Sequence, residues 1–84
     1  MTTRTVKYRP LYEFLLNSKE DVAELTRPEI EKILGFSLPK SSKMREWWAN
    51  DPFQGHYQAF AWIDAGFCVT SLKDETIIFE KKSK

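Results

Sequence analysis

The sequence predicts an α+β domain in which three helices are followed by a C-terminal β-hairpin. Two observations predict the helices: apolar residues recur at helical spacing near the N-terminus, and a full set of helix-start residues follows at Thr26. A third observation predicts the hairpin, because two runs rich in β-branched and aromatic residues, separated by a polar turn, lie near the end of the chain. The 84 residues suffice for one such domain.

The first predicted helix begins at Arg9-Pro10. Proline is tolerated in a first helical turn because an N–H group there has no partner to lose. Leu11, Phe14 and Leu15 follow at the i, i+3 and i+4 spacing of one apolar helix face. Asn17 ends the pattern. We therefore expect a short amphipathic helix here.

The second helix has the strongest local signal in the chain. Thr26 fits the N-cap, Pro28 the first turn, and Glu29 the position from which a carboxylate bonds back to the N-cap N–H. Gly35 stands where a left-handed residue commonly ends a helix. The pattern predicts a helix over Arg27–Leu34.

Three tryptophans fall within 16 positions, two of them adjacent in the connector that follows the second helix. Neighbouring side chains point to opposite faces of a strand and lie about 100° apart on an α-helix. We therefore expect at least one of Trp47 and Trp48 to be partly exposed. Trp62 shares a segment with other apolar residues and is expected mainly in the core.

The third helix is predicted from His56 to Ala65, where Gly66 ends it. Two strands, Phe67–Leu72 and Thr76–Glu80, are predicted to form the hairpin through the polar turn at 73–75.

This order of elements resembles the general plan of winged-helix domains, in which a third helix precedes a two-stranded wing. A turn of a few residues usually joins the second and third helices, whereas here about 20 residues intervene. We expect a winged-helix-like α+β fold with a long Trp-containing connector, and a non-winged α+β domain is the alternative. Residues 1–8 are expected to form a flexible N-terminal segment, 9–80 a single small domain and 81–84 a basic tail.

Net charge narrows the possible partners. The formal charge is +1, from 13 basic and 12 acidic side chains. This charge excludes an acidic mimic of DNA and argues against a protein that is held to nucleic acid by bulk charge. The charges are segregated, with a balance of −3 over residues 11–39 and of +2 over residues 40–48. A basic face is one interpretation, and scattered solvated charge is the other.

A cytoplasmic, reducing location is the expectation, because the lone Cys68 has no partner for an internal disulfide. No apolar run has the length of a signal-peptide core or a membrane span, so no membrane association is expected.

No set of residues indicates a catalytic reaction. His56 and Cys68 are the only candidates for a Cys–His pair, and Cys68 lies in an apolar run where a buried, inert thiol is expected. One His and one Cys do not form a zinc site without carboxylates. The acids at 74–75, which are candidates for a nuclease metal site, fall in the predicted hairpin turn, where solvated charge is the better interpretation. We expect a protein that is not an enzyme and has no cofactor and no metal.

Nucleic-acid binding is the favoured function, most readily of duplex DNA. Cations contact phosphates, amides read base edges, and aromatic side chains stack on bases. Residues of these types cluster around the tryptophan pair and the start of the third helix. The candidates for phosphate contacts are Lys40, Lys43 and Arg45. The candidates for recognition of bases or shape are Trp47, Asn50, Tyr57 and Gln58. In the competing interpretation, Trp48 and Trp62 pack the core and the amides only form turns.

Four motifs follow one another along the chain: Leu25-Thr26-x-x-Glu29-Ile30-Glu31-x-Ile33-Leu34-Gly35, Leu38-Pro39-x-Ser41, Trp47-Trp48-Ala49-Asn50 and Ala61-Trp62-x-x-Ala65-Gly66. In this pattern, from about Tyr8 to Phe79, the chain resembles a family of small, uncharacterised bacterial and phage domains without an established activity. The resemblance implies stand-alone proteins or small modules that accompany nucleases and other DNA-transacting proteins. Residues 51–57 depart from the pattern, which implies a different ligand if that segment contacts one.

The alternative function is that of an interaction protein. Trp, Tyr and Arg are also the favoured anchors of protein interfaces, and a nearly neutral chain suits a protein partner. In this interpretation the region from Trp47 to Asn50 is a binding hot spot of a phage or bacterial protein that inhibits or regulates a host protein, such as a CRISPR or restriction defence complex.

Overall fold

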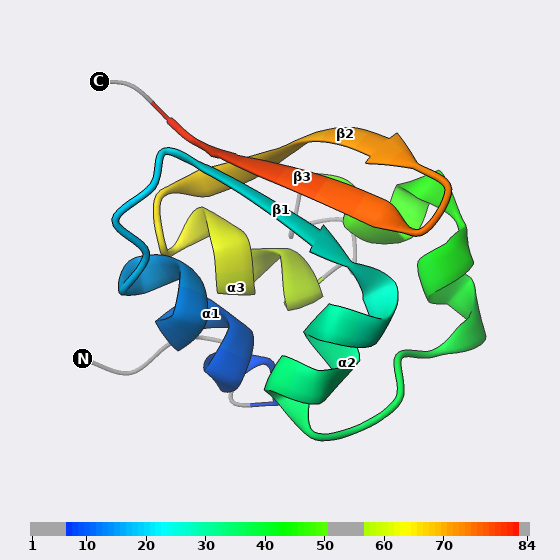
Figure 1. Ribbon diagram of the computed structural model, residues 1–84. Coiled ribbons are helices and arrows are strands. Elements are labelled where there is room, and N and C mark those ends of the chain that lie inside the picture. The colour runs from blue at the N-terminus through cyan, green and yellow to red at the C-terminus, as the bar shows by residue number, and fades with distance from the viewer. Residues whose placement is uncertain (1–6, 51–56, 83–84) are drawn as a thin grey trace.

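The computed structural model describes residues 7–50 and 57–82 and shows an α+β fold, with three α-helices and a three-stranded antiparallel sheet (Figure 1). Within the described residues, three short 3₁₀ helices add to these elements. In chain order the elements are α1 (Arg9–Leu16), β1 (Val22–Thr26), α2 (Arg27–Leu34), η1 (Lys40–Lys43), η2 (Arg45–Trp48), η4 (Tyr57–Ala59), α3 (Phe60–Ile63), β2 (Phe67–Lys73) and β3 (Thr76–Lys81).

The sheet has the strand order β1-β3-β2, so the last strand of the chain lies in the centre. Strands β2 and β3 pair antiparallel, as the hairpin prediction required. Asp74 turns the chain between them with a φ of 56°, a left-handed conformation that Asp adopts more readily than most residues. A register shift between Val69 and Ser71 interrupts the pairing of β2.

Strand β1 is an element that the sequence analysis did not predict, so the expected order of helix, helix, helix and hairpin is incomplete. The strand pairs with β3, where Ala23 lies opposite Phe79 and Leu25 opposite Ile77. Five residues with Glu24 in the middle give too weak a local signal. The strand forms because β3, about 50 residues later in the sequence, supplies its hydrogen-bonding partner.

The first two helices begin and end where the sequence predicts. In α2 the capping box is complete: the Thr26 hydroxyl accepts from the Glu29 N–H at 3.3 Å, and the Glu29 carboxylate accepts from the Thr26 N–H at 2.8 Å. Gly35 ends this helix with a φ of 86°. The third helix is shorter than predicted, because the described part of residues 56–65 forms a 3₁₀ turn followed by one α-helical turn.

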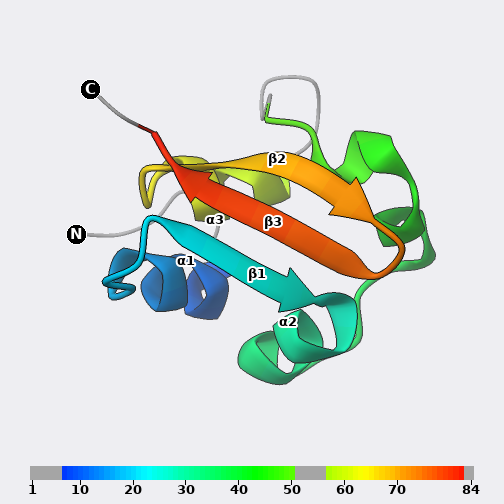
Figure 2. The ribbon, with the colours of Figure 1, turned by 45° about the horizontal axis from the view of Figure 1, so that its top comes forward.

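The α-helices lie on one face of the sheet, and none of the described helices covers the other face, called the bare face below (Figure 2). The core between the two layers is strongly aromatic. The Trp62 side chain is 0% exposed, as expected, and its ring stacks on Trp48 at 5.6 Å between centroids. Phe79 of the central strand packs against both indoles.

The prediction that Trp47 or Trp48 is partly exposed is wrong, since the two side chains are only 8% and 2% exposed. Both are buried because η2 lies between two aromatic groups. Trp47 packs on Tyr8, with the ring centroids 5.9 Å apart, while Trp48 turns to Trp62 on the other side. A local periodicity argument assumes one buried face, and here there are two.

Residues on both sides of the expected 9–80 domain take part in the fold, among them Tyr8 and Lys81. Tyr8 packs against the core, and burial raises the pKa of its phenol. Lys81 is the last residue of β3. Among the described helices, none combines the length and apolar character needed to cross a membrane.

We predict that Trp62→Ala lowers the free energy of unfolding by about 3–5 kcal/mol, because it opens a large cavity under the sheet. Urea denaturation followed by circular dichroism measures this change. Leu16→Ala is the control, since that side chain is 52% exposed and its truncation is expected to cost less than about 1 kcal/mol. Equal losses in the two variants would contradict the role of Trp62 as a core residue.

Candidate functional site

Three of the predicted contact residues form a basic ridge, defined here as Lys40, Lys43 and Arg45. They lie on η1 and η2, and all three side chains are exposed. Lys40 and Lys43 are three positions apart, which places them on the same side of a 3₁₀ helix. In the part of the chain that the structure describes, no carboxylate lies within ion-pair distance of the ridge.

The ridge is fixed to the core by hydrogen bonds from buried side chains. The Trp48 indole N–H donates to the Ser42 carbonyl at 2.7 Å, and the Ser42 hydroxyl donates to the Pro39 carbonyl at 2.6 Å. One turn earlier, the Leu38 N–H donates to the Glu31 carboxylate of α2 at 2.8 Å. The three cations are therefore carried by an ordered backbone, although their elements are only four residues long.

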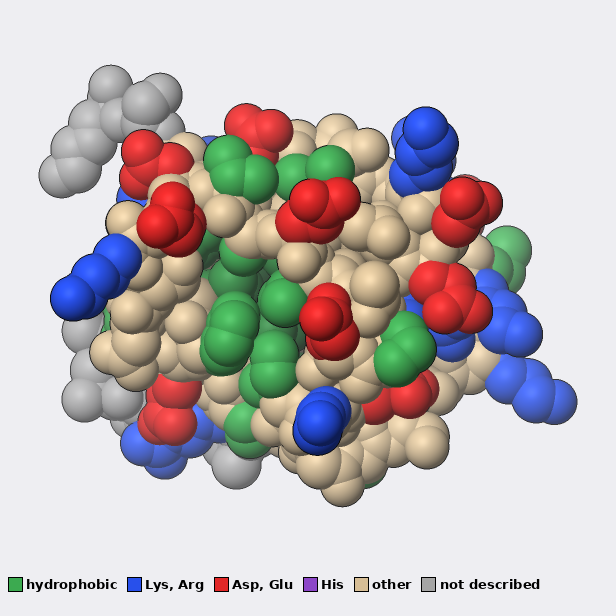
Figure 3. All heavy atoms as spheres, viewed as in Figure 1, with side chains coloured by type: hydrophobic (Ala, Val, Ile, Leu, Met, Phe, Trp, Pro, Cys, Tyr) green, Lys and Arg blue, Asp and Glu red, His purple; other side chains and the backbone are tan. Residues whose placement is uncertain are grey.

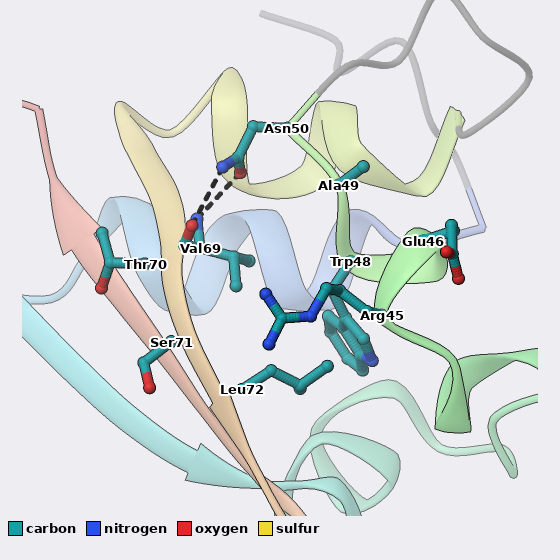
Figure 4. A pocket seen from close by; sticks show the side chains of 9 residues that line it. All are labelled: Arg45, Glu46, Trp48, Ala49, Asn50, Val69, Thr70, Ser71 and Leu72. Carbon is teal, nitrogen blue, oxygen red and sulfur yellow. Dashed lines mark hydrogen bonds between the residues drawn. The ribbon is translucent and has the colours of Figure 1, made fainter.

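A pocket of about 370 Å³ lies between η2 and the edge strand β2. The Arg45 side chain extends across it from η2 toward Val69 and Leu72, and Trp48 lies beside the guanidinium (Figure 4). Thr70 and Ser71 point to the other side of the strand. A guanidinium that has no ion-pair partner among the described residues and lies over an apolar wall can hold an anionic group. The pocket lining includes no nucleophile paired with a general base.

Asn50, predicted to recognise bases or shape, is exposed, but its side-chain amide is engaged in hydrogen bonds to the protein itself. Its Oδ1 accepts from the Trp62 indole N–H at 2.9 Å and from the Val69 N–H at 2.8 Å. Its Nδ2 donates to the Val69 carbonyl at 2.9 Å. The amide thus occupies the outer hydrogen-bonding edge of β2 as a neighbouring strand would, and reading a base would require these bonds to break.

Trp47 and Gln58, two further predicted contact residues, lie behind the ridge. Both are buried, and the Gln58 side-chain amide donates to the Trp47 carbonyl at 2.8 Å. Tyr57 begins η4, and its side chain lies outside the described part of the chain, as does His56. The structure therefore brings Lys40, Lys43 and Arg45 to the surface together and places Trp47 and Gln58 underneath.

The sequence analysis missed the β2 side of the pocket, formed by Val69 and Leu72. No local signal could have found it, because more than 20 residues separate these strand positions from Arg45.

Other chemistry has little support in the described residues. Cys68, expected to be buried, is only partly buried and lies on a strand of the sheet. Within the ranges 7–50 and 57–82, no group of three His, Cys, Asp or Glu side chains is placed to hold a metal ion.

Comparison with known proteins gives one family. The sequence model of a family described as a domain of unknown function (DUF7662) matches residues 8–83, nearly the whole chain. No curated protein and no solved structure matches the chain.

We predict that Asn50→Ala lowers the free energy of unfolding by about 2–3 kcal/mol, because it leaves the buried Trp62 N–H without an acceptor. Asn17→Ala is the matched control, since its amide makes one exposed bond to the Glu13 carbonyl and its loss costs less than about 1 kcal/mol. Thermal unfolding of both variants measures the difference. A fully stable Asn50→Ala protein that has lost ligand binding would instead assign Asn50 to recognition.

Proposed function

This chain belongs to the DUF7662 family, whose description names no activity, and we propose that it is a non-catalytic domain that binds the backbone of nucleic acid, duplex DNA in particular. The basic ridge is the contact surface. Lys40, Lys43 and Arg45 neutralise phosphates, and the domain recognises the shape and charge of the duplex more than its base sequence.

One observation supports this proposal above the others: three exposed cations stand together on an anchored backbone without a described acidic partner. Elsewhere in the described chain, Arg9 forms an ion pair with Glu13 at 2.9 Å and Arg27 lies 4.0 Å from Glu75. Glu46 follows Arg45 in η2, so the net charge of residues 40–48 is +2. Three cations against one carboxylate form a local positive field, which attracts phosphates.

The winged-helix interpretation belongs to this proposal as an analogy of fold. A helix followed by a two-stranded hairpin is present, with β1 added beside the hairpin. The third helix cannot enter a groove as recognition helices do, because Phe60, Ala61 and Trp62 are buried. Contact is therefore assigned to the ridge on the connector.

A second candidate function is that of an interaction protein that regulates or inhibits a host protein, such as a defence complex. The buried Trp47 and Trp48 offer little apolar area to a partner. A different observation favours this candidate, namely the exposed apolar side chains of α1 and β1, among them Phe14 and Val22. A complex held by these side chains would persist in high salt, whereas DNA binding would not.

We predict that the protein binds a random-sequence DNA duplex. If the three cations each contact one phosphate, raising the salt from 50 to 200 mM weakens this binding about 40-fold. In Lys43→Gln/Arg45→Gln, affinity falls and the slope of log affinity against log salt drops from about −2.7 to about −0.9. Fluorescence anisotropy with a labelled duplex measures both quantities.

The control is Lys19→Gln/Lys82→Gln, which makes the same change in net charge at two exposed lysines away from the ridge. Its salt slope is expected to match that of the unmodified protein. The proposal fails if the two double variants bind alike, or if the unmodified protein does not bind the duplex at 50 mM salt.

A further inference from the structure

Strand β1 has a free edge. The Asp21 carbonyl accepts from the Lys81 N–H at 2.7 Å, and the Arg27 N–H donates to the Glu75 carbonyl at 2.8 Å. Backbone groups alternate in direction along an antiparallel strand, so those of Ala23 and Leu25 also face β3. The backbone groups of Val22, Glu24 and Thr26 must therefore point away from the sheet. The Thr26 N–H is taken by the Glu29 carboxylate, but within the described chain no group pairs with Val22 or Glu24 on this side.

An apolar groove, defined by Phe14, Leu25 and Ile33, runs beside this edge between α1 and α2. It comprises two hollows of about 500 and 350 Å³ that share Phe14 and Ile33. The Phe14 side chain is 43% exposed, although it belongs to the apolar face of α1. In Figure 3 the hydrophobic side chains gather in this hollow, with carboxylates around it.

The two faces of β1 differ in chemistry. Ala23 and Leu25 pack toward the helices, whereas the side chains of Val22 and Glu24 are exposed. A strand added to the free edge would alternate in the same way. One set of its side chains would enter the apolar groove, and the other set would lie beside Glu24 on the bare face of the sheet.

Charge around the groove indicates the kind of partner. Residues 11–39 contain six acidic and three basic side chains. Glu20, Asp21 and Glu24 are exposed near β1, and no described cation pairs with them. Lys32 lines one hollow without reversing the balance. Cross-strand pairs of opposite charge stabilise added strands, so a basic partner fits.

We propose that the free edge of β1 and the apolar groove together bind an extended segment of a partner protein that alternates apolar residues with Lys or Arg. The segment adds as a fourth strand beside β1, its apolar side chains filling the groove and its cations pairing with Glu24 and its neighbours. A second copy of the chain is a poor occupant, because strand pairing between two β1 edges would bring together two sets of Glu20, Asp21 and Glu24.

The probe is the labelled peptide Lys-Val-Lys-Val-Lys-Val-Lys, and fluorescence anisotropy measures its binding to the full chain. Lys-Lys-Val-Val-Val-Lys-Lys has the same composition without the alternation, and a third peptide carries N-methyl groups on alternate backbone amides. Both controls are expected to bind at least about tenfold more weakly, since each removes the side-chain alternation or the ladder hydrogen bonds.

Two pairs of variants test the protein side. Val22→Pro removes an edge N–H, while Val22→Ala keeps it; only the proline is expected to weaken binding, by about tenfold. Phe14→Glu puts a charge in the groove, while Leu16→Glu adds the same charge at an exposed position of α1 outside the groove lining. Because added acid alone would attract the peptide, a loss confined to Phe14→Glu identifies the groove.

Each outcome decides the proposal. The proposal is overturned if either control peptide binds as tightly as the alternating peptide, or if the alternating peptide does not bind. It is also overturned if sedimentation shows a dimer that Val22→Pro abolishes. The N-methylated peptide keeps the test valid if Val22→Pro fails to fold. The double variant Lys43→Gln/Arg45→Gln should bind the alternating peptide like the unmodified protein, so the outcome is independent of nucleic-acid binding.

Discussion

The contact between Trp48 and Trp62 supports most of the remaining structure. The two indoles stack at 5.6 Å, and each N–H donates to a different part of the connector: Trp48 to the Ser42 carbonyl and Trp62 to Asn50 Oδ1. A buried indole N–H without an acceptor is costly, so each ring holds a segment of backbone in one place. Two hydrogen bonds and one stack thus join η1, η2 and α3 beneath the sheet.

This arrangement explains how a connector with little regular structure presents an ordered surface. The backbone from Pro39 to Asn50 forms only two short 3₁₀ helices, which have few internal hydrogen bonds. Its order comes from side chains that reach into the core and from Asn50, which covers the outer edge of β2 at Val69. The basic ridge is then displayed on the outside of the segment whose inside packs the core.

The molecule also separates two surfaces in a chain whose formal charge is only +1. One edge of the sheet, β2, is partly capped by Asn50 and lies beside the basic ridge. At the other edge, no described residue pairs with the outer side of β1 at Val22 or Glu24, and acidic residues and exposed apolar side chains surround the strand. Under the two proposals, opposite charge on the two sides would let one small domain contact nucleic acid and a basic protein segment without competition between them. The two proposals concern different residues and stand or fall separately.

The sequence by itself determined the elements with local causes. The capping box at Thr26 and the left-handed Gly35 delimit α2, and the two strands of the hairpin follow from β-branched runs around a polar turn. Tertiary structure decided the rest, because β1 depends on a partner strand about 50 residues away and the burial of Trp47 depends on Tyr8. It also decided which candidate residues are free to bind: Lys43 and Asn50 are equally polar in the sequence, but only packing showed that the amide of Asn50 is already bonded to Trp62 and Val69.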